Sequence, residues 1–283
     1  MNLDQIVDQM GGLSPVHRVL QRALQIINDP RSNMADLAKI IKLDQAMTGL
    51  ILRWVNSSYY SLKKPMGSIE QAVAYLGFTA VQNLVLTTSV SGIMNRPVNG
   101  YALEKGDLWK HAIGTAAGAQ LIIKEIAPEK AEDAYYGGLF CDVGKLAFDR
   151  LLQTTIPRVN LESASNASFD QVEKALFGYD HAEVGAALIR RWGFPQELAM
   201  VVENHHVPAN LDPSMKVVGY AVHVADAVMS MFGVGIGRDS MQYVIDPASL
   251  DVLKWKEDSF ENFYNRIIPL VEEAEIFLQQ AYK

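Results

Sequence analysis

One stretch in the middle of the chain, from Gly137 to Lys145, combines three side chains that could do chemistry. It reads Gly-Gly-Leu-Phe-Cys-Asp-Val-Gly-Lys, so a thiol, a carboxylate and an amine stand among glycines and apolar residues. A carboxylate buried in such surroundings is costly unless it is paired, hydrogen-bonded or bound to a metal ion. We therefore expect Asp142 to meet partners from elsewhere in the chain.

The candidate partners of Asp142 stand on the apolar sides of other predicted helices. They are His111, His181, His205, His206 and Asp226. Each has an ordinary explanation when taken singly: a core histidine, a helix start, an exposed helix end, or an aspartate paired with the nearby His223. Taken together, imidazoles and carboxylates on facing helices are typical ligands of Fe, Mn, Zn or Ni. The residue types thus favour a metal site, with a metal-free polar cluster as the alternative.

The bulk composition narrows the function classes. The chain has 283 residues, of which 49% are hydrophobic and 20% charged, as expected of a globular protein with a substantial core. Its net charge is −7 and it lacks a run of basic residues. Because nucleic-acid binding needs clustered lysine and arginine, the charge argues against that class.

The sequence also predicts the compartment. The single cysteine excludes an intramolecular disulfide and favours a reducing environment. The first residues carry acids in place of a basic signal-peptide region, and no stretch of about 18 apolar residues could span a membrane. We therefore expect a cytoplasmic protein.

Helical spacing of apolar residues dominates the chain, whereas alternating strand patterns are scarce. The sequence predicts an all-α fold of many helices. Helix starts are expected at Ser14-Pro15, at Asp44, at Ser68 and at Asp180 with Glu183, and a kink is expected at Gly77. Five of the candidate ligands fall in predicted helices over 103–125, 180–191, 196–206 and 214–232. Asp142 falls in the central stretch within 131–152, between two helix-like segments, and further helices are expected over 155–166 and 259–281.

The order of the candidate ligands resembles a known pattern. His111, then Cys141-Asp142, then Asp226 is similar to the His … His-Asp … Asp arrangement of the HD superfamily of metal-dependent phosphohydrolases. Further segments resemble HDOD domains within that superfamily. These segments are 44–57, 68–77, 108–111, 181–185, 192–195 and 205–206, and the resemblance covers about residues 10–230.

The resemblance implies a bacterial, all-helical regulatory or signalling module. It suggests an N-terminal helical subdomain over residues 1–95, an HD-like helical core over 101–232 and a C-terminal helical extension over 233–283. It also implies that His111, Asp142, His181, His205, His206 and Asp226 are the metal ligands, if a metal is bound. Lys145 stands where active relatives carry a lysine that meets a substrate phosphate, and its alternative is a surface or helix-end lysine.

Two departures bear on catalysis. Cys141 replaces the histidine of the His-Asp pair, and it is read either as a small buried hydrophobe, which we favour, or as a zinc-binding thiolate. The segment after His206 lacks the Gly-Tyr-Pro of the related cyclic-di-GMP phosphodiesterases.

Two functions follow from these observations. The first is a non-catalytic signalling module that acts through unidentified protein partners, with residues 3–95 as the expected partner surface, or through a ligand in a degenerate site. The alternative is a metal-dependent phosphohydrolase, either a phosphomonoesterase or a phosphodiesterase, with Lys145 stabilising the developing charge.

Overall fold

The computed structural model describes residues 2–8, 31–42, 44–57, 62–155, 167–239 and 244–281. Within these ranges the regular elements are helices, and one isolated β-bridge joins Val98 to Leu103. The all-α prediction is confirmed. The helix expected after Ser14-Pro15 and nearly all of the one expected over 155–166 lie outside the described residues. In the part of the chain that is described, no helix is long and apolar enough to cross a bilayer.

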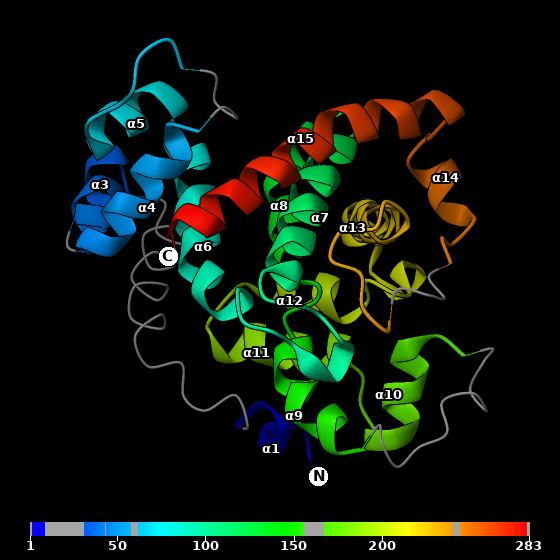
Figure 1. Cartoon of the computed structure of the whole chain (residues 1–283). Coiled ribbons are helices and arrows are strands. Elements are labelled where there is room, and N and C mark those ends of the chain that lie inside the picture. Colours follow the sequence, from blue (N-terminus) through cyan, green and yellow to red (C-terminus); the bar gives the residue numbers. More distant parts are fainter. Residues whose placement is uncertain are drawn as a thin grey trace. The chain divides into compact units, whose positions relative to one another are not determined.

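The helices follow one another as shown in Figure 1. The α-helices are α1 (Leu3–Asp8), α3 (Met34–Lys42), α4 (Gln45–Val55), α5 (Ile69–Leu76), α6 (Phe78–Met94), α7 (Asp107–Lys124), α8 (Ala131–Phe140), α9 (Lys145–Thr155), α10 (Phe169–Phe177), α11 (His181–Arg191), α12 (Gln196–Glu203), α13 (Pro213–Met231), α14 (Ala248–Val252) and α15 (Glu257–Ala281). The described residues also form the short 3-10 helices η2 (Asn99–Tyr101), η3 (Pro128–Lys130) and η6 (Pro208–Asn210).

The chain divides into two compact units. The first comprises Met1–Gly11 and Met94–Val271, and the second comprises Gly12–Ile93 and Glu272–Lys283. The first helix therefore belongs to the same unit as the helices that follow residue 94, and the last residues of α15 belong to the other. As a domain assignment, the division into residues 1–95, 101–232 and 233–283 stays a prediction.

In the second unit, local sequence signals set the helix ends. The Asp44 side chain caps α4 by accepting the Met47 amide at 2.9 Å, and Ser68 caps α5 by accepting the Gln71 amide at 3.3 Å. Gly77, with φ of 85°, separates α5 from α6. These two caps and the break at Gly77 confirm the sequence predictions, because short polar side chains and glycine act locally.

In the first unit, α13 is buried on nearly all sides and packs against α7 and α8, as its end-on view in Figure 1 shows. Small residues allow this close approach. A Cβ added to Gly138 on α8 would lie 2.7 Å from the backbone of Thr115 on α7, and one added to Gly118 would meet Phe263 and Ala225. The helices that carry the candidate site are therefore held backbone to backbone.

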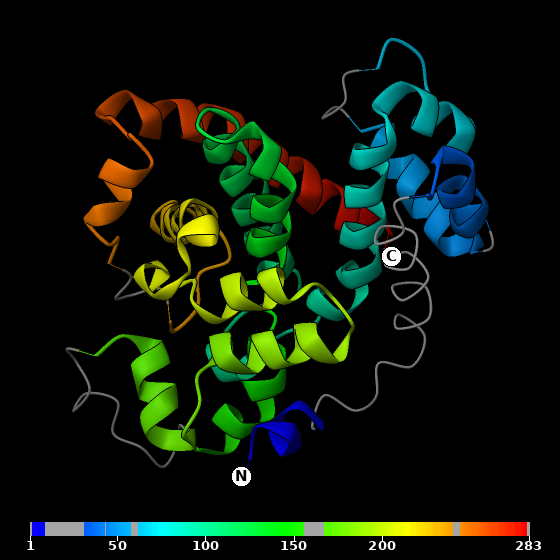
Figure 2. The ribbon, with the colours of Figure 1, turned by 180° about the vertical axis from the view of Figure 1, so that it is seen from behind.

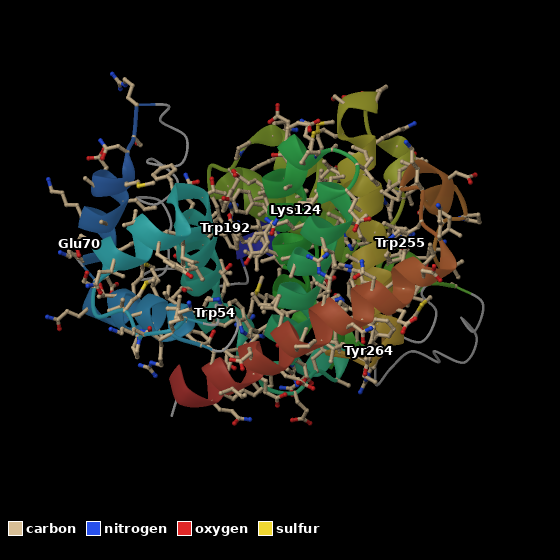
Figure 3. All side chains as sticks on the ribbon, turned by 90° about the horizontal axis from the view of Figure 1, so that it is seen from above. Trp54, Glu70, Lys124, Trp192, Trp255 and Tyr264 are labelled. Atoms are coloured by element: carbon tan, nitrogen blue, oxygen red, sulfur yellow. The ribbon has the colours of Figure 1, made fainter. Side chains whose placement is uncertain are left out.

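Three further packing contacts lie within the first unit. The helices α11 and α12 lie side by side, in yellow-green in Figure 2. Trp255, labelled in Figure 3, precedes α15 and packs its ring 4.5 Å from that of Phe260. The helix α1 packs on α9 and α11, where Arg191 pairs with Asp8 at 2.6 Å.

Candidate metal centre

Asp142 lies in the tight turn between α8 and α9, and glycine brings that turn against the start of α11. A Cβ on Gly144 would lie only 1.9 Å from the carbonyl oxygen of His181. Only a residue without a side chain allows the two backbones to meet so closely. As a result Asp142, although only 2% exposed, faces helices that are distant in sequence.

Asp142 joins His111 from α7 and Asp226 from α13 in one group whose ligand atoms lie within 4.8 Å of one another. The His111 Nε2 atom is 2.6 Å from Asp226 Oδ1 and 3.7 Å from Asp142 Oδ2. The hydrogen-bond partner of Asp226 is thus His111. The two ring nitrogens of His223 form other hydrogen bonds: Nδ1 donates to the carbonyl oxygen of His205, and Nε2 accepts from the backbone amide of Asp246.

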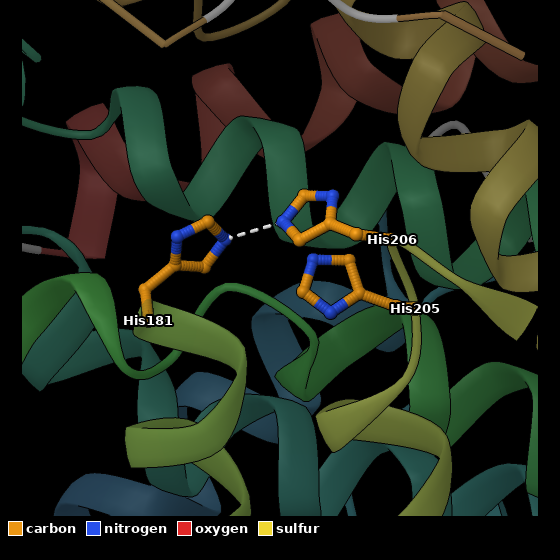
Figure 4. Close-up of side chains that lie close together, drawn as sticks. All are labelled: His181, His205 and His206. Atoms are coloured by element: carbon orange, nitrogen blue, oxygen red, sulfur yellow. Dashed lines mark hydrogen bonds between the residues drawn. The ribbon is translucent and has the colours of Figure 1, made fainter. Parts of the chain in front are cut away.

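A second group consists of His181, His205 and His206, and Figure 4 shows the three rings facing one another. The Nε2 atoms of His181 and His206 are 2.9 Å apart. His205 and His206 follow the end of α12, where adjacent side chains can turn toward one point. His205 is fully buried, so its interpretation as an exposed helix end is wrong.

Asp142 stands between the two groups, because its Oδ1 atom is 3.5 Å from His181 Nε2 while its Oδ2 atom faces His111. The sequence-predicted ligands are therefore brought together in one place. We call this set the polar centre: His111, Asp142, His181, His205, His206 and Asp226.

Hydrogen bonds on the outer side of three rings set which nitrogen faces the polar centre. The Nδ1 atoms of His111 and His205 lie 2.8 and 2.7 Å from the carbonyl oxygens of Val234 and Val202. A carbonyl only accepts, so both Nδ1 atoms carry hydrogen. The Nδ1 of His181 lies 2.8 Å from a carboxylate oxygen of Glu173. In each ring Nε2 is thus the atom offered to the polar centre.

The electrostatic setting differs among the histidines. Burial would lower the pKa of His181, but the Glu173 carboxylate outweighs it and raises this pKa to about 9. Burial, together with the neighbouring rings of His205 and His181, holds the pKa of His206 well below its usual value. His181 therefore donates from Nε2 to the neutral ring of His206 when no metal is present.

Two buried atoms of the polar centre make no hydrogen bond within the described residues: Asp142 Oδ1 and His205 Nε2. Both are acceptors that point among other nitrogen and oxygen ligands. An orphaned buried acceptor is costly, and a divalent cation would satisfy both. The residues therefore fit a transition metal held by imidazole and carboxylate donors.

The same residues lie in a chain that matches the HDOD domain over residues 13–208. The chain belongs to the HDOD family. This confirms the resemblance read from the motifs. A curated relative, an uncharacterised protein of Treponema pallidum, is 23% identical over 222 residues, which cover 76% of this chain and 42% of the relative. The chain thus spans less than half the length of that relative.

Solved structures share the HDOD fold. A Marinobacter aquaeolei protein named for signal transduction superposes with a TM-score of 0.76 at 20% identity, covering 99% of this chain and 65% of that one. A Shewanella amazonensis protein named as a phosphohydrolase gives a TM-score of 0.75 at 21% identity, covering 99% and 97%. Likeness at this identity establishes the helical fold and leaves activity open.

Lys145 of this HDOD chain is the first residue of α9, in line with the helix-end alternative, but it is buried and not at the surface. Its Nζ atom lies 2.8 Å from Asp142 Oδ2 and also pairs with Asp239, and its side chain is 9% exposed. Burial would lower the pKa of Lys145, but these two carboxylates raise it well above its usual value. Its charge is therefore fixed and already neutralised.

Cys141, which replaces the histidine of the HD pattern, packs among the apolar residues of the core. Its thiol lies 3.3 Å from the carbonyl of Gly138, and burial raises its pKa well above the usual range. A thiol in this setting keeps its proton, whereas a metal ligand must lose it. This geometry supports the interpretation of Cys141 as a small buried hydrophobe.

Three residues that support the polar centre carry no signal in the sequence pattern: Tyr101, Glu173 and Asp239. Each comes from a different segment and acts through a contact to Lys145 or His181. Glu173 reads as one polar position in a short amphipathic helix, and Asp239 as a loop residue. A run of apolar residues on both sides of Glu173 in the sequence would have indicated that it is buried, but Val172 precedes it and the charged Lys174 follows it.

Proposed function

We propose that this protein is a regulatory HDOD module whose polar centre binds a divalent transition metal without turning over a phosphate ester. The observation that carries the proposal is the double salt bridge of Lys145. The resemblance to active HD phosphohydrolases implies that this ammonium would meet the substrate phosphate. Here Asp142 and Asp239 hold it on both sides in a buried position.

The donor set supports metal binding. His111, His181 and His205 direct Nε2 inward because their Nδ1 atoms are engaged outside. When bound, a metal of this class supplies Lewis acidity and can lower the pKa of a coordinated water. In our proposal Asp142 and Asp226 contribute the negative charge of the site. The imidazole ligands favour Fe, Mn, Zn or Ni over Mg or Ca, which prefer oxygen ligands.

The second unit supports a regulatory role. It contains a cleft of about 530 Å³ that is lined by Gly49, Leu52, Arg53, Asn56, Ser57, Glu273, Ile276 and Phe277. The residues of the polar centre all belong to the first unit. In our proposal a protein partner contacts the helices within residues 31–93, since α1 is engaged with α9 and α11. The signal would pass by contact.

The alternative, a working metal-dependent phosphohydrolase, keeps one specific observation in its favour. Asp142 stands between two ligand groups, with one carboxylate oxygen toward each. Sites that clamp both sides of a phosphate often place a carboxylate between two metals. In this alternative Lys145 would have to leave Asp239 and turn toward the substrate.

One experiment tests both functions. The protein is purified without a chelating tag, and bound metals are measured by mass spectrometry in the wild type and in the His111→Ala, Asp142→Ala and Asp133→Asn variants. Asp133 lies on α8, outside the polar centre, and pairs with Lys130 at 3.4 Å, so its variant is the control. We expect a transition metal in the wild type and the control, and less than about a tenth of it in the other two.

The same preparations are assayed with nitrophenyl phosphate mono- and diesters. We expect no turnover above that of the Asp142→Ala variant. Turnover that disappears in both ligand variants and persists in the Asp133→Asn control would establish the phosphohydrolase instead. Absence of metal, even after incubation with excess Fe, Mn, Zn and Ni, would reject metal binding.

A further inference from the structure

Glu173 is a buried charge in an unexpected place. It is the only buried residue of α10, a helix whose other side chains are at least partly exposed, and its own exposure is 0%. An amphipathic helix normally buries an apolar side chain at such a position. Burying a carboxylate instead is costly unless specific donors meet it.

Three donors from two other segments meet the Glu173 carboxylate. The hydroxyl of Tyr101, from η2, donates to Oε1. The backbone amide of His181 donates to Oε2 at 2.7 Å, and the ring Nδ1 of His181 donates to the same oxygen at 2.8 Å. Every partner is buried, so water competes little for these bonds.

These bonds fix both the ring plane and the tautomer of His181. With Nδ1 donating to Glu173, Nε2 faces the polar centre, 2.9 Å from His206 Nε2 and 3.5 Å from Asp142 Oδ1. His111 and His205 donate Nδ1 to neutral carbonyls, whereas His181 alone among these three has a full negative charge behind it. A carboxylate behind an imidazole increases the basicity of the metal-facing nitrogen.

We propose that Glu173, braced by Tyr101, is a positioning residue that orients His181 and strengthens it as a ligand of the metal in the polar centre. This inference rests on the metal binding proposed above. It adds α10 and η2 to the parts of the chain that determine metal affinity, although neither contributes a ligand.

The test compares metal affinity in the full-length wild type, Glu173→Gln, Glu173→Asp and Glu183→Gln. The first variant keeps the shape of the side chain and removes its charge. The second keeps the charge and draws it back from Nδ1. Glu183 is the matched control, because it is a glutamate in the first turn of α11, close in sequence to His181, where it forms a capping box with Asp180. Its carboxylate accepts a hydrogen bond from Lys174 at 2.6 Å and is directed away from the His181 ring.

Zn²⁺ and Co²⁺ are titrated against the metal-free proteins in competition with a chromogenic chelator. We expect both Glu173 variants to bind about 10- to 100-fold more weakly, and Glu183→Gln to stay within about threefold of the wild type. The visible absorption spectrum of the bound Co²⁺ should shift in the Glu173 variants only. A purely structural role of Glu173 would lower thermal stability and leave that spectrum unchanged.

The outcomes separate the two proposals. A wild type that binds metal together with a folded Glu173 variant of unchanged affinity and spectrum overturns this inference and leaves the proposed function standing. A wild type that binds neither Zn²⁺ nor Co²⁺ overturns this inference, and one that also binds no Fe, Mn or Ni rejects the proposed function as well. Circular dichroism selects the folded variants, and Glu173→Asp carries the test where Glu173→Gln does not fold, because it preserves the charge at the start of α11.

Discussion

At the scale of single residues, Lys145 dominates the electrostatics of the polar centre. It is a cation built into the first unit, between Asp142 and Asp239, and it offsets carboxylates that would otherwise repel one another. A metal bound in the polar centre, as proposed above, would share Asp142 with this ammonium group.

The first prediction removes this cation. Lys145→Met should lower the free energy of unfolding by about 3–5 kcal/mol, since it removes the ammonium that pairs with Asp142 and Asp239. Lys124→Met is the control: Lys124, labelled in Figure 3, is exposed on α7 and bonds Gln120, so its loss should cost less than about 0.5 kcal/mol. Urea unfolding of metal-free protein measures both. Equal stability of the two variants would show that Lys145 does not offset the buried charges.

A rescue experiment extends this prediction. In Lys145→Met, a metal at about 100 times its dissociation constant should restore about 2.7 kcal/mol, because it binds only the folded state and places positive charge beside Asp142. Restoration is measured as the shift of the urea midpoint. A variant that stays unstable in saturating metal would contradict the assignment of Asp142 as a ligand.

The second prediction concerns His181 and pH in the metal-free protein. Its folded-state pKa of about 9 lies above the usual value of 6.5, so its protonation stabilises the fold. That stabilisation is complete below pH 6.5 and is lost as the pH rises through about 9. The difference in unfolding free energy between the wild type and His181→Gln should shrink by on the order of 3 kcal/mol across this window. Urea unfolding in the presence of a chelator measures it, and a difference independent of pH would contradict it.

At the scale of elements, the approach of α9 to α11 places the polar centre. Gly144 lets the turn before α9 contact the backbone of His181 and Gly185. Asp142, two residues earlier, depends on this contact to face the histidines. The precision of the polar centre therefore rests on a backbone contact and not on a side-chain bond.

The third prediction tests that contact. Gly144→Ala would put a Cβ 1.9 Å from the His181 carbonyl oxygen and 2.7 Å from the Gly185 amide nitrogen, neither of which can rotate away. We expect destabilisation by about 3 kcal/mol, with loss of metal binding. Gly49→Ala is the control, because nothing lies within 4 Å of its added Cβ on α4. That variant should be neutral or gain about 0.5–1 kcal/mol in calorimetry. Wild-type metal binding in Gly144→Ala would contradict the argument.

At the scale of the whole molecule, all six residues of the polar centre belong to one unit. That unit is built from Met1–Gly11 and Met94–Val271, and the other unit supplies the cleft between α4 and the end of α15. Sensing and partner contact would thus reside in different parts of the chain.

The fourth prediction follows from this division. Adding metal to the metal-free protein should slow hydrogen exchange in peptides from α7, α11 and α13, because these helices hold the ligands. In the absence of a partner, the rate of hydrogen exchange in peptides from α3 to α5 should not change when metal is added. Exchange followed by mass spectrometry measures both. A metal effect confined to α3–α5 would place the binding site elsewhere than in the polar centre.

The local features of the fold could be predicted from the sequence. The caps at Asp44, Ser68 and Asp180, the break at Gly77 and the helical character depend on neighbours within a turn or two. The order of motifs also indicated the family and the six residues of the polar centre. Such signals are readable because residue type and spacing along the chain carry them.

The tertiary structure alone decided the partners of the buried charges. Glu173, Tyr101 and Asp239 come from separate segments, and their roles depend on the atoms that meet them after folding. The same holds for Lys145, which helical spacing describes equally well as a surface lysine or a phosphate ligand. Periodicity reports which face of a helix is apolar, but the cost of burying a charge is known only once its donors and counter-charges are in place.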